Sequence, residues 1–440
     1  MKSFHTLHSP HLHSKLIWMF WILALIMLLI FMFPGRASGS EQVIYTFAGG
    51  NDGSGPNALI ADKAGNLFGT TFDGGGSSGA GTVFELSPQK GGGWTETILY
   101  SFSNDQLQNG IGPKAGLVMD SFGDLFGTTW LGGPNGGGEV FELFPPTQPG
   151  EPWSFNIIYD FSAPNDGYSP EAPLTIDAAG NLYGTTSVGG TGQCIGGCGT
   201  VFMLTPPNRM LGGGWGETIL FNFAGSATLG GGTLAGVILD ANGAVYGTTS
   251  SGSGGKFGTV FKLTPPAQSG KRWTHTVLYA FKGKNDGLAP ASGIVFDASG
   301  NLYGTTQYGG SSTSCFGQSC GTVFELTPAP SGQWTHNILY TFAGGNDGGN
   351  PASNVLFNTK GNLYGTTLAG GGSGCSGTGC GTVFRLRPLG GTWKESVLHA
   401  FTDGSDGAGP GGLALGKGSQ LYGVAGAGAN NAGLVFTASP

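Results

Sequence analysis

A single phrase of the sequence recurs seven times and constrains the fold more than any other feature. Its fullest copy, residues 300–306, reads Gly-Asn-Leu-Tyr-Gly-Thr-Thr, and a glycine-rich loop separates it from a second half at 321–328. The copies lie 57 to 63 residues apart. A fixed period of this size indicates one supersecondary unit stacked on copies of itself. The first half of the phrase ends at Thr71, Thr129, Thr186, Thr249, Thr306, Thr367 and, in a diverged copy, Ala425.

Each unit is predicted to contain four β-strands. Residues 273–281 are rich in aromatic and β-branched side chains, which favour a strand, and the Asn-Asp-Gly sequence at 285–287 then predicts a turn. Apart from the N-terminal segment, no part of the sequence has the 3.6-residue apolar period of a helix, so we expect almost none. The other three predicted strands of this unit are 291–297, 302–306 and 322–327.

Four short antiparallel strands repeated seven times predict an all-β fold, a seven-bladed β-propeller of four-stranded blades. A β-solenoid is the alternative, although its coils usually take fewer residues, from about 20. If the tryptophan-containing strand is outermost in each blade, the strand at 43–47 belongs to the last blade and closes the ring on 434–437. We favour this order because segments such as 291–294 are small at one end, which suits the crowded axis. The opposite order gives no such closure.

The N-terminus is predicted to be a separate segment. Residues 16–33 are 18 consecutive apolar residues, preceded by Lys2 and Lys15. Residues 1–39 therefore form either a cleaved signal peptide or a retained membrane anchor, because the run reaches spanning length. In both cases residues 41–440 form the propeller and lie outside the cytoplasm, secreted, in the periplasm or at the cell surface. The membrane is a partner only through this segment, if it is uncleaved.

Composition narrows the possible partners. The chain has 18 Lys and Arg against 25 Asp and Glu, a formal net charge of −7. Nucleic acid is excluded as a partner because binding to phosphates requires a basic face. Hydrophobic residues make up 39% of the chain and recur at matching positions of the repeats. This pattern favours a packed fold over disorder. We expect a monomer.

The repeat also resembles a known family. Gly-Asn-Leu-Tyr-Gly-Thr-Thr, a Gly-Gly loop and Gly-Thr-Val-Phe-x-Leu-Thr-Pro are similar to the GloVer-type tandem repeat of bacterial choice-of-anchor proteins. The resemblance covers essentially all of residues 41–440, with six copies nearly intact. It implies an exported bacterial repeat protein of uncharacterised activity, and it supplies no catalytic residues.

Six cysteines occur as three close pairs within the glycine-rich loops. In an exported protein such local pairs predict disulfides, each stapling one short loop and contributing about 2 kcal/mol. The alternative is a four-cysteine zinc site between blades five and six. It is disfavoured because the pair in blade three has no neighbouring pair. The predicted disulfides are Cys194–Cys198, Cys315–Cys320 and Cys375–Cys380.

The Asp-Gly turns supply the candidate ligand-binding residues. Hard cations such as calcium prefer oxygen ligands, so carboxylates around the channel mouth could bind calcium or sugar hydroxyls. The competing interpretation is that Asp-Gly only forms the turn, and no cofactor other than calcium is suggested. The candidates are Asp52, Asp166, Asp286, Asp347 and Asp406.

Catalytic residues are unknown from the sequence. Outside the N-terminal segment the histidines are His275, His336 and His399, all in tryptophan-type strands. His275 and His336 stand where other units have Glu96 or Glu217, a variation typical of an ordinary strand surface. No nucleophile–base or phosphate-loop motif is present.

We therefore favour an exported, non-catalytic repeat scaffold. It would bind a glycan or protein through the face that carries the long glycine-rich loops, because loops on a rigid scaffold usually carry function. The alternatives are a carbohydrate-active hydrolase or lyase that uses loop-face carboxylates, and a structural cell-envelope protein. Aromatic residues near these loops that could stack on sugars are Trp130, Tyr168, Phe257, Tyr308 and Phe316.

Overall fold

The computed structural model describes residues 41–440, with gaps at 77–78, 104–108, 149, 163–165, 195, 208–212, 226–230, 233–234, 252–256, 269, 313, 316–318 and 352. The chain divides into two units, Met1–Ser38 and Gly39–Pro440. The predicted leader, residues 1–39, lies outside the described residues. Within the described residues, no helix has the length and apolar character needed to cross a membrane.

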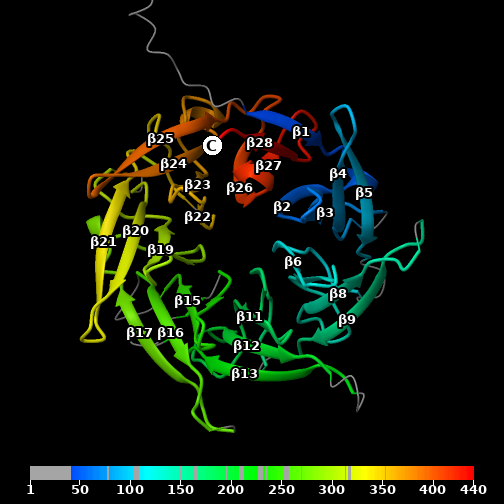
Figure 1. Cartoon of the computed structure of the whole chain (residues 1–440), viewed down its shortest axis with the longest axis horizontal. Coiled ribbons are helices and arrows are strands. Elements are labelled where there is room, and N and C mark those ends of the chain that lie inside the picture. Colours follow the sequence, from blue (N-terminus) through cyan, green and yellow to red (C-terminus); the bar gives the residue numbers. More distant parts are fainter. Residues whose placement is uncertain are drawn as a thin grey trace, which may run out of the picture. The chain divides into compact units, whose positions relative to one another are not determined.

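Seven four-stranded antiparallel sheets follow one another around a ring within the second unit (Figure 1). This arrangement confirms the predicted seven-bladed β-propeller and excludes the β-solenoid. Blade 1 is β2 (Ser54–Ala61), β3 (Leu67–Asp73), β4 (Thr82–Pro88) and β5 (Trp94–Ser101). Blade 2 is β6 (Val118–Met119), β7 (Leu125–Thr129), β8 (Glu139–Phe144) and β9 (Ser154–Asp160). Blade 3 is β10 (Thr175–Ile176), β11 (Leu182–Thr186), β12 (Thr200–Thr205) and β13 (Gly216–Asn222).

The remaining four blades continue the same order from inside to outside. Blade 4 is β14 (Ile238–Leu239), β15 (Val245–Thr249), β16 (Thr259–Thr264) and β17 (Thr274–Ala280). Blade 5 is β18 (Val295–Phe296), β19 (Leu302–Thr306), β20 (Thr322–Pro328) and β21 (Trp334–Thr341). Blade 6 is β22 (Leu356–Phe357), β23 (Leu363–Thr367), β24 (Thr382–Leu389) and β25 (Thr392–Ala400). Blade 7 is β26 (Ala408–Leu415), β27 (Leu421–Ala427), β28 (Leu434–Ala438) and β1 (Gln42–Thr46).

Helical structure is confined to single 3₁₀ turns among the described residues, as expected from the apolar periodicity. These turns are η1 (Gly50–Asp52), η3 (Lys284–Asp286), η4 (Cys375–Gly377) and η5 (Lys417–Ser419).

The first strand closes the ring on the last one. β1 pairs antiparallel with β28, with Gln42 opposite Thr437 and Thr46 opposite Leu434, and Figure 1 shows the two strands side by side. Phe47, directly after β1, has no exposed surface and packs in the core between blades 7 and 1. The structure thus confirms both the predicted closure and the predicted position of the tryptophan-type strands at the outer edge.

The innermost strands are shorter than predicted in five of the blades. The strand predicted at 291–297 is reduced to β18, Val295–Phe296. Near the axis, backbone groups bond to neighbouring blades instead of to their own sheet. Gly293 N–H donates to Asn354 Oδ1 at 2.6 Å, and the Ser292 carbonyl accepts the Thr248 hydroxyl at 3.0 Å. Blades 7 and 1, which flank the closure, keep eight-residue inner strands.

The repeated Gly-Thr-Thr phrase is explained by packing. The blade 3 copy is Gly184-Thr185-Thr186. The glycine leaves room for the phenylalanine ring of the next strand, because a Cβ at Gly184 would lie 2.4 Å from Phe202 Cζ. The first threonine ties two blades together, since Thr185 Oγ1 donates to the Ala235 carbonyl at 3.0 Å. The second, Thr186, pairs with Thr200 across the sheet, with 2.9 Å between their hydroxyl oxygens.

Replacing Gly184 with alanine should therefore destabilise the protein. The added methyl group must displace the fully buried Phe202 ring, and overpacking of this kind costs about 1 to 3 kcal/mol. Denaturant titration would measure the change. Gly216→Ala is the matched control, because no atom of the described residues lies within 4 Å of a Cβ there and the change should be close to neutral. Equal stability of the two variants would contradict the packing explanation.

The loops divide between two faces of the ring, as predicted. The Asn-Asp-Gly loops contact the glycine-rich loops directly, because Gly75 N–H donates to the Gly50 carbonyl and Gly310 N–H to the Lys284 carbonyl, both at 2.8 Å. We call this side the long-loop face. The turns between the inner two strands lie on the opposite side, the short-turn face. There Asp62 Oδ1 accepts the N–H groups of its own turn.

Candidate functional site

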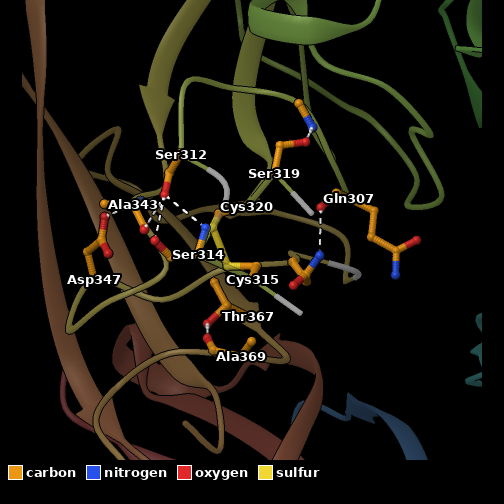
Figure 2. Close-up of a disulfide and its surroundings, with 12 residues drawn as sticks. Gln307, Ser312, Ser314, Cys315, Ser319, Cys320, Ala343, Asp347, Thr367 and Ala369 are labelled. Atoms are coloured by element: carbon orange, nitrogen blue, oxygen red, sulfur yellow. Dashed lines mark hydrogen bonds between the residues drawn. A yellow bond between two sulfur atoms is a disulfide. The ribbon is translucent and has the colours of Figure 1, made fainter. Parts of the chain in front are cut away.

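The five candidate aspartates bond to their own loops. Asp347 Oδ2 accepts the Tyr340 hydroxyl at 2.9 Å and the Ala343 N–H at 2.8 Å, and Figure 2 shows Asp347 beside Ala343. Carboxylates in this position complete the turn. Asp52, Asp166 and Asp286 repeat the pattern, and Asp406 uses His399 in place of the tyrosine.

The aspartates are not brought together into one site. Their tyrosine or histidine partners lie on the outermost strands of five different blades. Within the part of the chain that the structure describes, no group of three or more His, Cys, Asp or Glu residues is placed to hold a metal ion. The geometry favours the turn-forming interpretation, and calcium binding at these aspartates stays a prediction.

The histidines lie in seams between blades. The His336 ring stacks on Tyr279 of the preceding blade at 4.4 Å, and its Nδ1 lies 3.4 Å from Asp286 Oδ1. The His275 ring stacks on Phe221 at 4.3 Å, and burial lowers its pKa to about 4. The interpretation of these positions as ordinary strand surface is therefore wrong. The pattern of residue types along one strand does not reveal that a neighbouring blade covers these histidine side chains.

Four glutamates occupy the same position in other seams. Burial, followed by the charge of Asp52 in the preceding blade, raises the pKa of Glu96 to about 7. The other three respond in the same way to burial and to a carboxylate of the preceding blade. One carboxylate oxygen of each is buried without a hydrogen-bond partner in the described part of the chain. We call this set the seam glutamates, Glu41, Glu96, Glu217 and Glu395.

The three predicted disulfides are present. Each does more than staple its own loop. Cys315 and Cys320 are buried between blades 5 and 6, and a Cβ at Gly344 of the following loop would lie within 2.6 Å of both sulfur atoms. Figure 2 shows the bond beneath Ser312, whose hydroxyl donates to the Ala343 carbonyl at 2.6 Å. The pairing also leaves no free cysteine for the alternative zinc site.

The aromatic residues predicted near the loops differ in their surroundings. Phe257 packs against the core between blades 4 and 5. Tyr168 and Tyr308 are partly exposed and form isolated bridges between loops, and Phe316 lies outside the described residues. Trp130 is partly exposed on the long-loop face and lies 6.2 Å from the Phe72 ring.

The inner strands enclose a cavity of about 370 Å³ along the axis. Its lining is mostly small and apolar, from glycine, alanine, leucine and proline. Polar groups are few and come from several blades. They are Asn57, Lys114, Ser292, Ser353 and Asn354.

Lys114 organises the rim of this cavity on the long-loop face. Its Nζ lies 3.6 Å from the centre of the Trp130 ring and 5.8 Å from that of Phe72. The same Nζ lies 3.5 Å from Glu171 Oε2 of blade 3, and Glu171 also accepts the Ser187 hydroxyl at 3.3 Å. The rim thus combines a partly exposed ion pair with an aromatic pair.

Sequence reasoning missed Lys114 and Glu171. Each directly follows the proline that starts the inner segment of its blade. At the same position, other blades have Asn57, Ala291 or Gly411. Two charged residues at a position that faces the axis could have identified this position as a candidate site from the sequence. Their pairing depends on blades 2 and 3 being neighbours.

Other hollows lie between neighbouring blades. The cavity beside Phe122 and Trp215, between blades 2 and 3, measures about 610 Å³. Its Asp120 and Asp177 carboxylates accept N–H groups of their own turns. These acids are already used structurally, so the axial cavity is the stronger candidate site.

The chain belongs to the Gloeobacter/Verrucomicrobia repeat family, whose model matches residues 30–195, 150–314 and 195–436. This confirms the resemblance seen in the repeats. A comparison with curated proteins finds no match.

A solved structure supports the propeller fold. A "putative 6-phosphogluconolactonase" from Bacteroides uniformis is similar with a TM-score of 0.50 and 13% identity, covering 84% of this chain and 88% of that one. A gluconolactonase from Xanthomonas campestris has a TM-score of 0.39 and 12% identity, covering 74% and 85%. At such identities the likeness concerns the fold alone.

Proposed function

We propose that the protein is an extracytoplasmic binding propeller that holds the end of a glycan in the axial cavity, entered from the long-loop face. The observation that carries the proposal is the cavity rim, where the Lys114–Glu171 pair lies beside Trp130. Ligand sites are typically apolar pockets of about 300 to 1,000 Å³ with a few convergent polar groups. The axial cavity has this size and character.

The chemistry of the rim suits a polyhydroxylated ligand. The lysine ammonium supplies donors and the glutamate carboxylate supplies acceptors, so adjacent sugar hydroxyls can bond to both. Trp130 and Phe72 present apolar surface of the kind that sugars cover. Asn354 and Ser353, which also line the cavity, add neutral polar groups.

The disulfides support the extracytoplasmic location. Three disulfides within one chain are typical of an oxidising compartment and rare in the cytosol. A glycan at a cell surface is the corresponding partner.

Binding should depend on Lys114. Glycan-array screening of residues 40–440 should give a set of ligands, and Lys114→Ala should weaken the strongest by about 10- to 100-fold, the usual loss for a hydrogen bond to a charged group. Lys282→Ala is the matched control, because its Nζ lies over Tyr279 in a blade seam.

Two results would contradict the proposal. One is an array on which no glycan is retained, and the other is a Lys114→Ala variant that binds as tightly as the wild type. Incubating the strongest ligand with the protein then separates binding from hydrolysis. We expect the ligand to be recovered intact, whereas cleavage products would identify an enzyme.

A further inference from the structure

Blade 2 departs from the repeat at one buried position. Glu139, the first residue of β8, stands where five other blades have a threonine. In those blades the threonine hydroxyl lies 2.8 or 2.9 Å from the last threonine of Gly-Thr-Thr. The five residues are Thr82, Thr200, Thr259, Thr322 and Thr382.

The Glu139 side chain is fully buried, and its carboxylate forms no hydrogen bond with the described residues. Its exposed surface is 0%, and neither carboxylate oxygen has a hydrogen-bond partner among the residues that the structure describes. An isolated buried carboxylate is costly, and such groups are paired, protonated or bound to a metal. Burial, with the charge of Asp160 second, raises the pKa of Glu139 to about 8.

A second carboxylate converges on the first. Asp160 lies directly opposite Glu139 in the β8–β9 ladder. A Cβ at Gly133 would lie 2.4 Å from Asp160 Oδ1 and 2.8 Å from Glu139 Oε1, so both oxygens face this glycine. In blade 6, the corresponding Gly371 faces the Thr382 methyl group and Ala400. Blade 2 therefore has an acid pair at this position, where blade 6 has a threonine and an alanine.

Neutral oxygen is available on the other side of Glu139. A Cβ at Gly110 would lie 2.7 Å from Glu139 Oε2 and 2.3 Å from Thr129 Oγ1. Thr129 Oγ1 also accepts the Glu139 N–H at 3.1 Å. Asp160 is held from outside by the Asn135 N–H, which donates to Oδ2 at 3.1 Å. Asp160 therefore lies beside one carboxylate oxygen of Glu139, and the Thr129 hydroxyl lies beside the other.

We infer that blade 2 contains a binding site for a hard divalent cation of the calcium type, held between Glu139 and Asp160. Calcium takes six to eight oxygen ligands at about 2.3 to 2.6 Å. Glu139 and Asp160 supply the charge, Thr129 supplies a neutral oxygen, and backbone carbonyls or waters complete the shell. Two carboxylates give a modest affinity, of the order of the 10⁻⁴ to 10⁻³ M seen in extracellular modules. The site is independent of glycan binding at the axis.

The repeat itself provides the test variants. Glu139→Thr restores the residue of five other blades and should fold, and Asp160→Asn copies Asn222 of blade 3. After EDTA treatment, calcium should raise the Tm of the wild type, and Tb³⁺ should give luminescence excited through tyrosine and tryptophan. Both responses should be absent in Glu139→Thr and about tenfold weaker in Asp160→Asn. Glu85→Gln, at an acid of blade 1, should respond as the wild type does.

The stability of the cation-free proteins gives a second readout. Without calcium, Glu139→Thr should melt above the wild type, because it removes an unpartnered buried carboxyl and restores a threonine pair. A wild type that binds neither Ca²⁺ nor Tb³⁺ would overturn the inference and leave a shared proton between the acids. Unchanged binding by Glu139→Thr would overturn it as well.

Discussion

Replacing Phe47 with alanine should lower the free energy of unfolding by about 3 to 5 kcal/mol, the usual cost of emptying a buried aromatic site. Phe47 has no exposed surface, and its ring packs edge-on against Phe84 of blade 1 at 5.1 Å. Its backbone N–H donates to the Gly433 carbonyl at 3.0 Å. The residue thus joins the segment that begins with β1 to both the last blade and the first. Urea denaturation would measure the loss.

Two further variants make this result interpretable. Phe223 occupies the same place in blade 3 and is equally buried, so Phe223→Ala should cost a similar amount if the closing seam is packed as tightly as an internal one. Phe122 is 68% exposed, and Phe122→Ala should change stability by less than about 0.5 kcal/mol. A small effect at Phe47 together with a large one at Phe223 would show that the closure is loose.

Thermal stability should be greatest near mildly acidic pH and should fall as the pH rises through 7 to 8. The folded protein raises the pKa of the seam glutamates to about 7 and that of Glu139 to about 8, each from 4.5. For a group with a raised pKa, the stabilisation is complete below the unfolded pKa and is lost as pH rises through the folded one. These five groups should therefore make the free energy of unfolding fall between about pH 4.5 and 8, a fall that we call the alkaline limb.

His275 acts in the opposite direction. Burial lowers its pKa from 6.5 to about 4, so its contribution is present above pH 6.5 and is lost as pH falls toward 4. Because five raised carboxyls outweigh one lowered histidine over the range that they share, the maximum lies at the acidic end, at about pH 4.5. Calorimetry from pH 4 to 9 in the presence of EDTA would locate it.

A triple variant tests which groups cause the alkaline limb. Glutamine resembles a protonated glutamate, so combining Glu96→Gln, Glu217→Gln and Glu395→Gln should flatten the fall in Tm above pH 6. Glu85→Gln alone should leave the profile unchanged. A wild-type Tm that stays level or rises between pH 6 and 8 would contradict the assignment of raised pKa values to these seams.

Much of the architecture could be predicted because the repeat encodes it locally. Gly184, Thr185 and Thr186 each have a separate packing role in the ring, so the phrase they form is visible in the sequence. The closing strand could also be predicted, because residues 43–47 have the tryptophan-type pattern without a preceding unit. The length of the inner strands could not, because Gly293 bonds to Asn354 of the next blade.

The candidate site was less predictable, because it is formed between blades. Lys114 and Glu171 are 57 residues apart in the sequence, and only the ring geometry brings them within 3.5 Å. The seam position of Glu96 and His336 looks variable along the chain, although each of these side chains faces a tyrosine–aspartate pair. Glu139 was visible as a change from threonine, but its burial was not.

The pairing of β1 with β28 also determines when the molecule can be completed. Blades 1 to 6 each use one contiguous stretch of chain, so they can form in the order of synthesis. Blade 7 must wait, because Gln42 is synthesised long before its partner Thr437. Closure is therefore a long-range step, slower than hairpin formation within a blade. Until it occurs, two nascent molecules can exchange their first strands, which makes strand-swapped dimers the expected by-product of refolding at high concentration.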